Sequence, residues 1–141
     1  MTFARIGVLT VVVLFFVNLT TIHGVRGAEK DNRLFEMRTY VTYPGKLEAL
    51  HKRFREHTNV LFEKHGMQLV GYWTPVDGAE AENTLVYILV YPDRSARDQA
   101  WQAFGKDPDW KRVFAESRQD GPIVQKVISK FLMSTDYSPI K

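Results

Sequence analysis

The sequence contains no cysteine, and this absence removes several classes of protein at once. Without cysteine the chain cannot form a disulfide scaffold, a zinc ribbon, a thiolate-held iron–sulfur cluster or a cysteine nucleophile. It also has little glycine and proline, with 9 and 6 residues, while 45% of its residues are hydrophobic. These proportions exclude a disordered or collagen-like chain. The length of 141 residues therefore suits one globular domain.

The longest apolar run lies at the N-terminus, from Ile6 to Val17, just after the positive charge of Arg5. A membrane-spanning helix needs about 20 apolar residues, so this run is too short. A charged start, a short apolar run and small residues after it are typical of a secretory signal peptide. We predict cleavage after Gly27, which makes residues 1–27 the signal peptide and residues 28–33 a polar lead-in. The predicted product is exported, periplasmic or secreted, with no stable membrane span; an uncleaved N-terminal anchor is the alternative.

Cleavage at this point changes the charge of the chain. The whole sequence has a formal net charge of +3, and the loss of Arg5 and Arg26 without any acidic residue leaves +1. Nucleic-acid binding depends on concentrated positive charge, so we expect no nucleic-acid partner. The charged stretch from His51 to His57 is instead typical of a solvated helix face.

Residues 34–141 read as strands and helices in alternation. Apolar side chains at every second position predict a strand over 34–43, and apolar side chains at helical spacing predict a helix over 46–65 that Gly66 ends. Further strands are expected over 68–76, 84–91 and 123–134, with a helix from 93 or 95 to about 104 and a short extra helix from 107. The order is βαββαβ, so we predict an α+β, ferredoxin-like fold with a four-stranded antiparallel sheet.

A sheet with its helices on one face leaves the other face uncovered. From the first strand, the uncovered face would carry Leu34, Glu36, Arg38 and Tyr40. From the third strand it would carry either Leu85, Tyr87, Leu89 and Tyr91 or Val86, Ile88 and Val90, and the sequence leaves both open. Either set exposes a large apolar area, which usually marks an interface. We therefore expect a homodimer that packs sheet against sheet and encloses a cavity.

Several short motifs along the chain resemble a known family. They are Glu36-Met-Arg-Thr-Tyr40 followed by Pro44-Gly45, His65-Gly66 before Leu69-Val-Gly-Tyr-Trp-Thr74, Asn83 before an aliphatic strand, and Asp107-Pro-Asp-Trp110. In this order and spacing they resemble the NIPSNAP family, from about Phe35 to Ser138. The resemblance implies a dimeric α/β barrel. The wider superfamily of such barrels includes haem-degrading monooxygenases, cofactor-independent quinol monooxygenases and small-molecule isomerases, and the NIPSNAP family itself has no secure reaction.

The candidate catalytic residues are Glu36, Arg38 and Tyr40. Residues two apart on a strand point the same way, about 7 Å apart, so these three place an acid, a guanidinium and a phenol in one row. Arg38 would clamp a carboxylate or phosphate. Glu36 would act as a general base if burial raised its pKa, and Tyr40 would orient a substrate or donate a proton. The alternative is a structural Glu–Arg pair at the dimer interface.

The candidate ligand-binding residues are His57, Trp73, Asn83 and Tyr87. His57 falls on the apolar stripe of the first helix, where it would either reach the cavity or be a satisfied core residue. Trp73 and Tyr87 would form an aromatic wall around a flat organic ligand, or would mainly pack in the core or at the interface. Asn83 would bond within its loop or point into the pocket mouth. The spacing of the histidines suits no metal ion, and we predict neither a metal nor a cofactor.

Three functions remain open on the sequence. The first is an exported homodimer that binds a small organic molecule in the barrel cavity. The second is a cofactor-independent monooxygenase or isomerase that uses Glu36, Arg38 and Tyr40. The third is a protein-interaction module whose barrel is filled by its own side chains.

Overall fold

The computed structural model describes residues 33–141, so the predicted signal peptide (1–27) and most of the lead-in (28–33) lie outside the described residues. The elements are β1 (Leu34–Thr42), α1 (Leu47–Arg53), the π-helical turn η1 (Phe54–Thr58), α2 (Asn59–Lys64), β2 (Gln68–Trp73), the short 3₁₀ helix η2 (Ala79–Glu82), β3 (Thr84–Tyr91), α3 (Arg94–Lys106), α4 (Pro108–Glu116) and β4 (Val124–Leu132). The predicted order of strands and helices, with the extra short helix, is confirmed.

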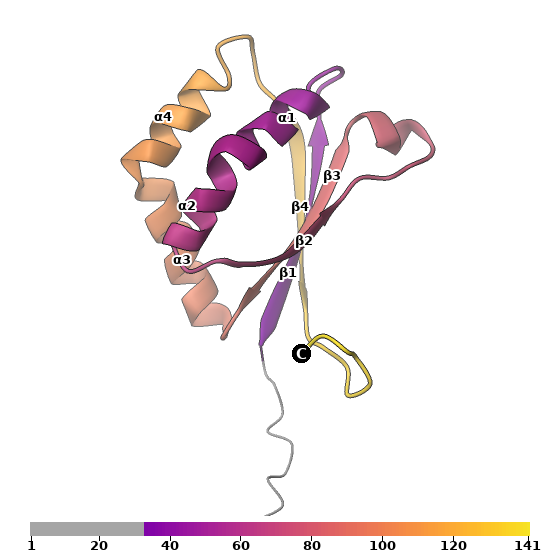
Figure 1. The fold of residues 1–141 in the computed structure, drawn as a ribbon, viewed down its shortest axis with the longest axis vertical. Coiled ribbons are helices and arrows are strands. Elements are labelled where there is room, and N and C mark those ends of the chain that lie inside the picture. The colour runs from indigo at the N-terminus through magenta and orange to yellow at the C-terminus, as the bar shows by residue number, and fades with distance from the viewer. Residues whose placement is uncertain (1–32) are drawn as a thin grey trace, which may run out of the picture.

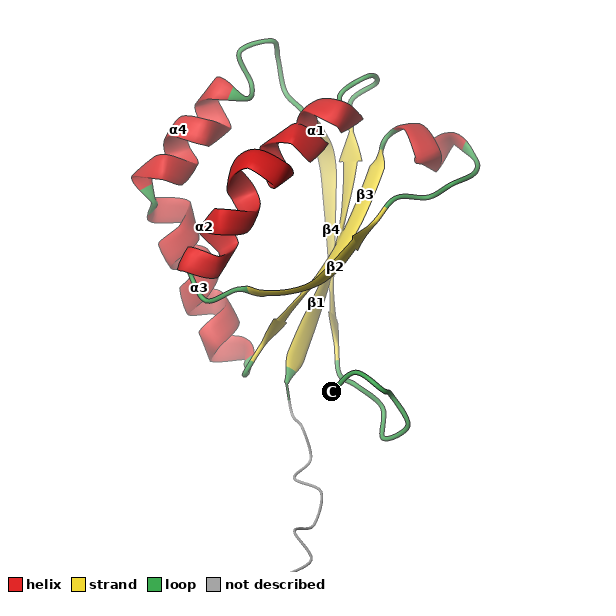
Figure 2. Cartoon of the chain, viewed as in Figure 1, coloured by secondary structure: helices red, strands yellow, loops and turns green. Residues whose placement is uncertain are grey.

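The four strands form one antiparallel sheet in the order β2-β3-β1-β4. This is the ferredoxin-like arrangement, so the predicted α+β fold is confirmed. Helices α1 to α4 all lie on one side of the sheet, and the short helix η2 lies in the connection between β2 and β3 (Figures 1 and 2). No helix within residues 33–141 is both long enough and apolar enough to cross a bilayer.

The pairing of β1 with β3 decides which side chains the helices cover. Glu36 pairs with Leu89, Arg38 with Tyr87 and Tyr40 with Leu85, and residues paired in this way share a face. Leu85, Tyr87 and Leu89 belong to the core beneath the helices. Glu36, Arg38 and Tyr40 therefore point toward the helices, and the prediction that they lie on the uncovered face is wrong.

The uncovered face is built from the other set of side chains. It carries Phe35, Met37, Thr39 and Val41 from β1, Val86, Ile88 and Val90 from β3, and Lys126, Ile128, Lys130 and Leu132 from β4. The part of this face on β1 and β3 is apolar, as expected from the sequence, whereas β4 adds two lysines. On β1, the residues of this face alternate with those that were predicted to lie there.

The first helix contains a π-helical turn, which shifts the phase of its side chains. The N–H of Asn59 donates to the carbonyl of Phe54, five residues earlier, and the Thr58 hydroxyl donates to the carbonyl of Arg53 at 3.2 Å. Thr58 is consequently buried, while 41% of the His57 side chain is exposed. The prediction that His57 lies on the apolar stripe is wrong, because that stripe assumed an uninterrupted α-helix.

Gly66 ends the first helix as predicted. It has φ of +71°, the left-handed region that glycine enters without a steric penalty. The N–H groups of Gly66 and Met67 donate to the carbonyls of Glu63 and Phe62, at 3.0 and 2.9 Å. This pair of bonds is a Schellman motif, and it turns the chain directly into β2. At its other end β2 stops at Trp73, shortly before Pro75, which lacks the N–H that a ladder needs.

The core between helices and sheet is rich in aromatic rings. Phe54 lies edge-on to Tyr87 with ring centroids 5.2 Å apart, and Phe104 lies 5.2 Å from Phe62 and 4.5 Å from Trp110. Edge-on and tilted contacts at such distances stabilise aromatic cores beyond simple area burial. The aromatic cluster thus holds η1, α2, α3 and α4 against the helix-covered face of the sheet.

Candidate functional site

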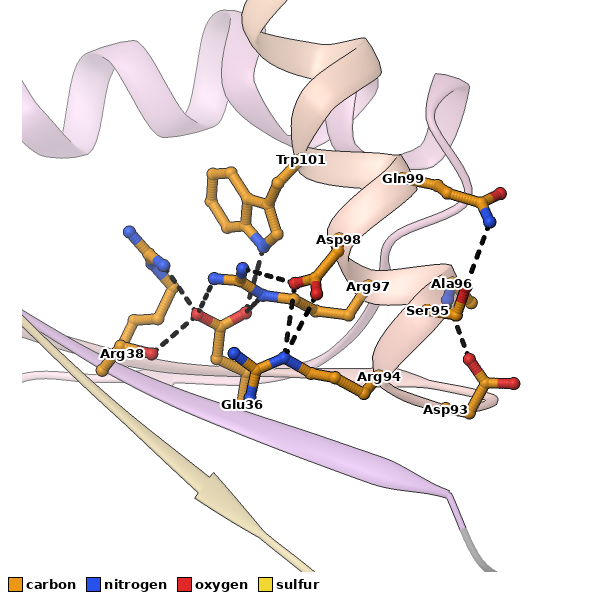
Figure 3. Close-up of polar contacts among 11 residues, drawn as sticks. Glu36, Arg38, Asp93, Arg94, Ser95, Ala96, Arg97, Asp98, Gln99 and Trp101 are labelled. Atoms are coloured by element: carbon orange, nitrogen blue, oxygen red, sulfur yellow. Dashed lines mark hydrogen bonds and ion pairs between the residues drawn. The ribbon is translucent and has the colours of Figure 1, made fainter.

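The carboxylate of Glu36 is the centre of a polar network between β1 and α3 (Figure 3). Its Oε1 accepts hydrogen bonds from Arg38, Arg97 and Ser129, each at 2.7 Å. Its Oε2 accepts from Nε of Arg97 at 2.8 Å and from the indole N–H of Trp101 at 3.0 Å. Glu36 is completely buried, and these bonds compensate for the loss of water around its charge.

This network determines the protonation of Glu36. Burial alone would raise the pKa of the carboxyl, but the hydrogen bonds from Arg97, Ser129 and Arg38 lower it to about 2. The condition set for a general base, a pKa raised by burial, is therefore not met. With both oxygens engaged, the geometry favours a positioning role for Glu36, which holds the two arginines in place.

The predicted row of acid, guanidinium and phenol is present. Nη1 of Arg38 donates to Glu36, and Nη2 donates to the Tyr40 hydroxyl at 3.4 Å. The guanidinium carbon also lies 4.2 Å from the ring centroid of Trp101, in a cation–π contact. Burial opposes the charge of Arg38, but Tyr87, Tyr40 and Glu36 outweigh it and raise its pKa. The row is thus permanently charged at Arg38.

Tyr40 also borders a small closed cavity between the sheet and the helices. Its lining consists of Tyr40, Arg53, Phe54, Thr58, Phe62, Trp101, Phe104 and Trp110. The volume is about 30 Å³, which holds one or two water molecules and no organic ligand.

A larger groove opens on the outside, between the first helix and α4. It is lined by Ala49, Lys52, Arg53, Glu56 and His57 on one side and by Val113, Glu116, Ser117 and Asp120 on the other. Its volume is about 340 Å³, within the range of about 300–1,000 Å³ that is typical of small-molecule sites. Arg53 lines both the groove and the closed cavity, so it separates the two spaces.

Arg53 is a functional candidate that the sequence analysis missed. Only 4% of the residue is exposed, and its Nε is buried without a hydrogen-bond partner. Nη1 donates to the Ser117 hydroxyl at 3.3 Å, and the guanidinium carbon lies 5.5 Å from the ring centroid of Trp110 and 5.7 Å from that of Phe114. Burial lowers the pKa of Arg53. Arg53 was missed because it lies in a charged stretch that is typical of a solvated helix face.

The four predicted ligand-binding residues do not come together. Tyr87 is buried beneath the helices, whereas Trp73 is half-exposed on the opposite face, with its ring stacked over Gly71. The sheet therefore divides the predicted aromatic wall. Asn83 bonds within its loop, since its Oδ1 accepts from the Thr84 hydroxyl at 2.8 Å. Of the four, His57 lines the groove, from its surface side.

A second charged cluster joins the end of α2 to the start of α4. Oδ2 of Asp107 lies 2.7 Å from Nε2 of His65 and 2.9 Å from Nζ of Lys64, while its Oδ1 accepts from the N–H of Asp109 and caps α4. Hydrogen bonds from Lys64 and His65 hold the pKa of Asp107 well below its usual range. Within residues 33–141, no group of three or more histidine, aspartate or glutamate side chains is arranged to hold a metal ion.

Part of the Glu36 network carried a signal in the sequence. Arg97 and Trp101 are four residues apart on α3, so they share one face of that helix. Ser129 had no comparable signal, because it reaches Glu36 only through the pairing of β1 with β4. Long-range partners of this kind depend on the register of the sheet.

Comparison with known proteins identifies the family. The family model named NIPSNAP matches residues 35–139. A NIPSNAP domain protein from Burkholderia xenovorans is 25% identical, with a TM-score of 0.64 over 75% of this chain and 98% of that one. A NIPSNAP family protein of unknown function from Agrobacterium tumefaciens is 22% identical, with a TM-score of 0.69 over 79% of this chain and 96% of that one.

A more distant structure shares the fold alone. SnoaB, a cofactor-independent oxygenase from Streptomyces nogalater, is 13% identical, with a TM-score of 0.51 over 77% of this chain and 98% of that one. No functionally curated protein matches the sequence. Since the family model spans most of the chain, from the start of β1 to the C-terminal tail, the protein belongs to the NIPSNAP family.

Proposed function

We propose that this protein is exported after removal of residues 1–27, forms a homodimer through the uncovered face of its sheet, and binds a small organic molecule in the groove between α1 and α4. The observation that carries ligand binding is the pair of adjoining spaces that share Arg53. The groove is large enough for a small ligand, and the closed cavity behind it has aromatic walls at Phe54 and Trp110.

The proposed ligand site lies within one chain and not between two sheets. Tyr40 and Tyr87 point toward the helices, and the closed cavity that Tyr40 borders is lined by residues of the same chain. The groove likewise lies between the first helix and α4 of one chain. Each protomer would therefore carry its own site. The dimer interface has a separate role, namely to cover apolar surface.

The uncovered face supports the proposed homodimer. Ile128 and Leu132 on β4 remain 36% and 40% exposed, and a hollow of about 190 Å³ lies between Phe35, Ile88 and the C-terminal segment at Ile140. Exposed apolar surface of this kind usually marks an interface between proteins, and Lys126 and Lys130 on β4 would lie at its edge. A second copy of the same face supplies a complementary apolar surface through a two-fold axis.

The catalytic alternative has less support. It relied on Glu36 as a base, but this carboxylate has a pKa of about 2 and receives hydrogen bonds on both oxygens. Similarity to an oxygenase at 13% identity concerns the fold and carries no reaction with it. We therefore assign Glu36, Arg38 and Tyr40 a structural role beside the site and propose no chemical step.

Native mass spectrometry on the purified, processed protein tests the proposal. We expect a mass that begins at Ala28, a dimer, and either a retained small-molecule mass or a mass gained after incubation with quinones, haem or fatty acids. The variant Ala49→Phe, which places a ring in the groove, should lose the added mass. Ala115→Phe is the matched control, since Ala115 is exposed on α4 and does not line the groove.

Each part of the proposal has its own contradictory outcome. A mass that includes residues 1–27 would contradict export by cleavage, and a monomer at micromolar concentration would contradict the dimer. An added mass that survives in Ala49→Phe would place the ligand elsewhere. A dimer with nothing bound under any of these conditions would shift the function toward protein partners.

A further inference from the structure

The interior between the helices and the sheet holds more positive charge than negative charge. Arg38 and Arg97 share the carboxylate of Glu36, and the other buried acid among residues 33–141, Asp107, is paired with Lys64 and His65. Arg53 is buried as well, yet no carboxylate of the described chain lies within 4.0 Å of its guanidinium. Buried arginines in proteins are normally paired with an acid, because an unpaired buried charge is costly.

The groups around Arg53 compensate for this charge only in part. Its contacts are one hydroxyl, Ser117, and the faces of Trp110 and Phe114. A hydroxyl and two ring faces leave most of the five N–H donors of a guanidinium unused, and its Nε has no hydrogen-bond partner. Burial lowers the pKa of Arg53; interactions with Tyr40 and Tyr87 oppose this effect, and the like charge of Arg118 adds to it.

The acids of the groove do not neutralise Arg53. Glu116 pairs with Arg112 at 3.1 Å, and Glu56 lies 3.9 Å from His57. The third acid of the lining is Asp120, which makes no ion pair within 4.0 Å with Arg53. All three belong to exposed residues at the groove surface, where water screens their charge. The charge of Arg53 therefore remains available at the inner wall of the groove.

The backbone next to Arg53 is also unusual. The π-helical turn η1 begins at the following residue, Phe54, and the carbonyl of Arg53 accepts a hydrogen bond from the Thr58 hydroxyl at 3.2 Å. Such turns in α-helices occur frequently at functional sites, because they change which side chains face inward. Here the turn accompanies the burial of both Arg53 and Phe54 on adjacent positions.

We infer that the groove between α1 and α4 binds a small carboxylic acid, with its carboxylate paired to Arg53 at the inner wall. A carboxylate matches the planar fork of a guanidinium through two parallel hydrogen bonds. Ala49 and Val113 give the groove an apolar part of its lining beside Arg53, which suits the hydrocarbon part of such an acid. This inference rests on the proposed ligand-binding function and names the chemical class of its ligand.

The test compares an acid with its uncharged amide. Isothermal titration calorimetry with 2-naphthoate and 2-naphthamide on the purified wild-type protein should give at least tenfold tighter binding of the acid. In Arg53→Gln the acid should lose at least tenfold in affinity, while the amide should stay within twofold. Arg55→Gln is the matched control, because Arg55 is two residues away, exposed, and paired with Glu48 on the surface. It should change neither probe by more than twofold.

A wild-type measurement covers the case in which Arg53→Gln does not fold. The arginine Nε–Hε resonance of Arg53, assigned by its absence in Arg53→Lys, should shift on addition of 2-naphthoate and not of 2-naphthamide. Arg53→Lys keeps the charge but loses the planar fork, so it should retain part of the preference for the acid.

The outcomes separate this inference from the proposed function. Equal affinity of acid and amide in the wild type, or a preference for the acid that survives in Arg53→Gln, would overturn the ligand class while leaving ligand binding intact. If neither probe binds the wild type at millimolar concentration, the inference is overturned. The mass retained or gained in native mass spectrometry, and its loss in Ala49→Phe, then decide separately whether the groove binds a different class of molecule.

Discussion

The indole N–H of Trp101 donates a hydrogen bond of 3.0 Å to Oε2 of Glu36, and this bond joins α3 to the central strand β1. The same carboxylate receives two guanidinium groups, from Arg38 and Arg97. A buried carboxylate is tolerated when its oxygens are engaged in this way, and removal of one partner leaves the others uncompensated. The stability of the domain should therefore respond strongly to changes in this network.

The first prediction concerns the acid stability of the wild-type protein. The pKa of Glu36 in the folded protein is about 2, below its ordinary value of 4.5. Ionised Glu36 therefore stabilises the fold fully above about pH 4.5, and this contribution is lost as the pH falls toward 2. The shift corresponds to roughly 3 kcal/mol. In Glu36→Gln we expect a lower free energy of unfolding at pH 7 and a smaller further loss at pH 3.

Urea unfolding followed by circular dichroism at pH 7, 4.5 and 3 measures this difference. Asp107 also has a lowered pKa and loses its contribution in the same acidic direction, so Glu36→Gln should reduce the acid dependence without abolishing it. Asp107→Asn is the control, because it should keep the part of the acid dependence that Glu36 contributes. An equal acid-induced loss in wild type and Glu36→Gln would contradict the assignment of the low pKa to Glu36.

The second prediction compares two tryptophans. Trp101→Phe keeps a ring between α3 and Arg38 but removes the N–H that Glu36 accepts. Loss of a hydrogen bond to a buried charge should lower the free energy of unfolding by about 1.5–3 kcal/mol. Trp73→Phe makes the same exchange on the uncovered face, where half of the side chain is exposed, and should cost less than about 1 kcal/mol. Equal costs would mean that the hydrogen bond to Glu36 adds nothing.

The third prediction concerns the uncovered face of the sheet. Ile88→Glu places a charge at the centre of that face, so we expect the protein to become monomeric at micromolar concentration while it keeps its circular dichroism spectrum. Val60→Glu is the control, since Val60 is 64% exposed on α2, on the other side of the molecule. Analytical ultracentrifugation measures both. A dimer that persists in Ile88→Glu would place the interface elsewhere.

The fourth prediction separates the two roles of Asp107. Its Oδ1 caps α4 by accepting from the N–H of Asp109, while its Oδ2 accepts from Lys64 and His65. Asp107→Asn keeps a capping oxygen but removes the charge, whereas Asp107→Ala removes both. We expect the Tm to fall in the order wild type, Asn variant, Ala variant, with steps of a few degrees, as measured by calorimetry at pH 7. Identical Tm values for the two variants would show that the cap contributes nothing.

The sequence determined the elements of this protein because their signals are local. Alternation over residues 34–43 predicted a strand, which the structure has at Leu34–Thr42, and Gly66 predicted the end of a helix. The apolar run Thr84–Tyr91 predicted a strand whose bounds the structure reproduces. The order of these elements then restricted the topology to one arrangement. Local alternation also placed Glu36, Arg38 and Tyr40 in one row, since side chains two apart on a strand share a face.

Only the tertiary structure decided whether the helices cover the face of β1 that carries this row or the opposite face. Period two divides a strand into two sets of side chains but does not say which set meets a helix, and on β3 both sets are apolar. The burial of Arg53 could not be predicted for the same reason. Its position in a charged stretch of helix predicts an exposed side chain, and only the packing of α4, with Trp110, buries it. Burial, and with it the pKa of Glu36 and the uncompensated charge of Arg53, arises from contacts between segments far apart in the chain, which no local pattern records.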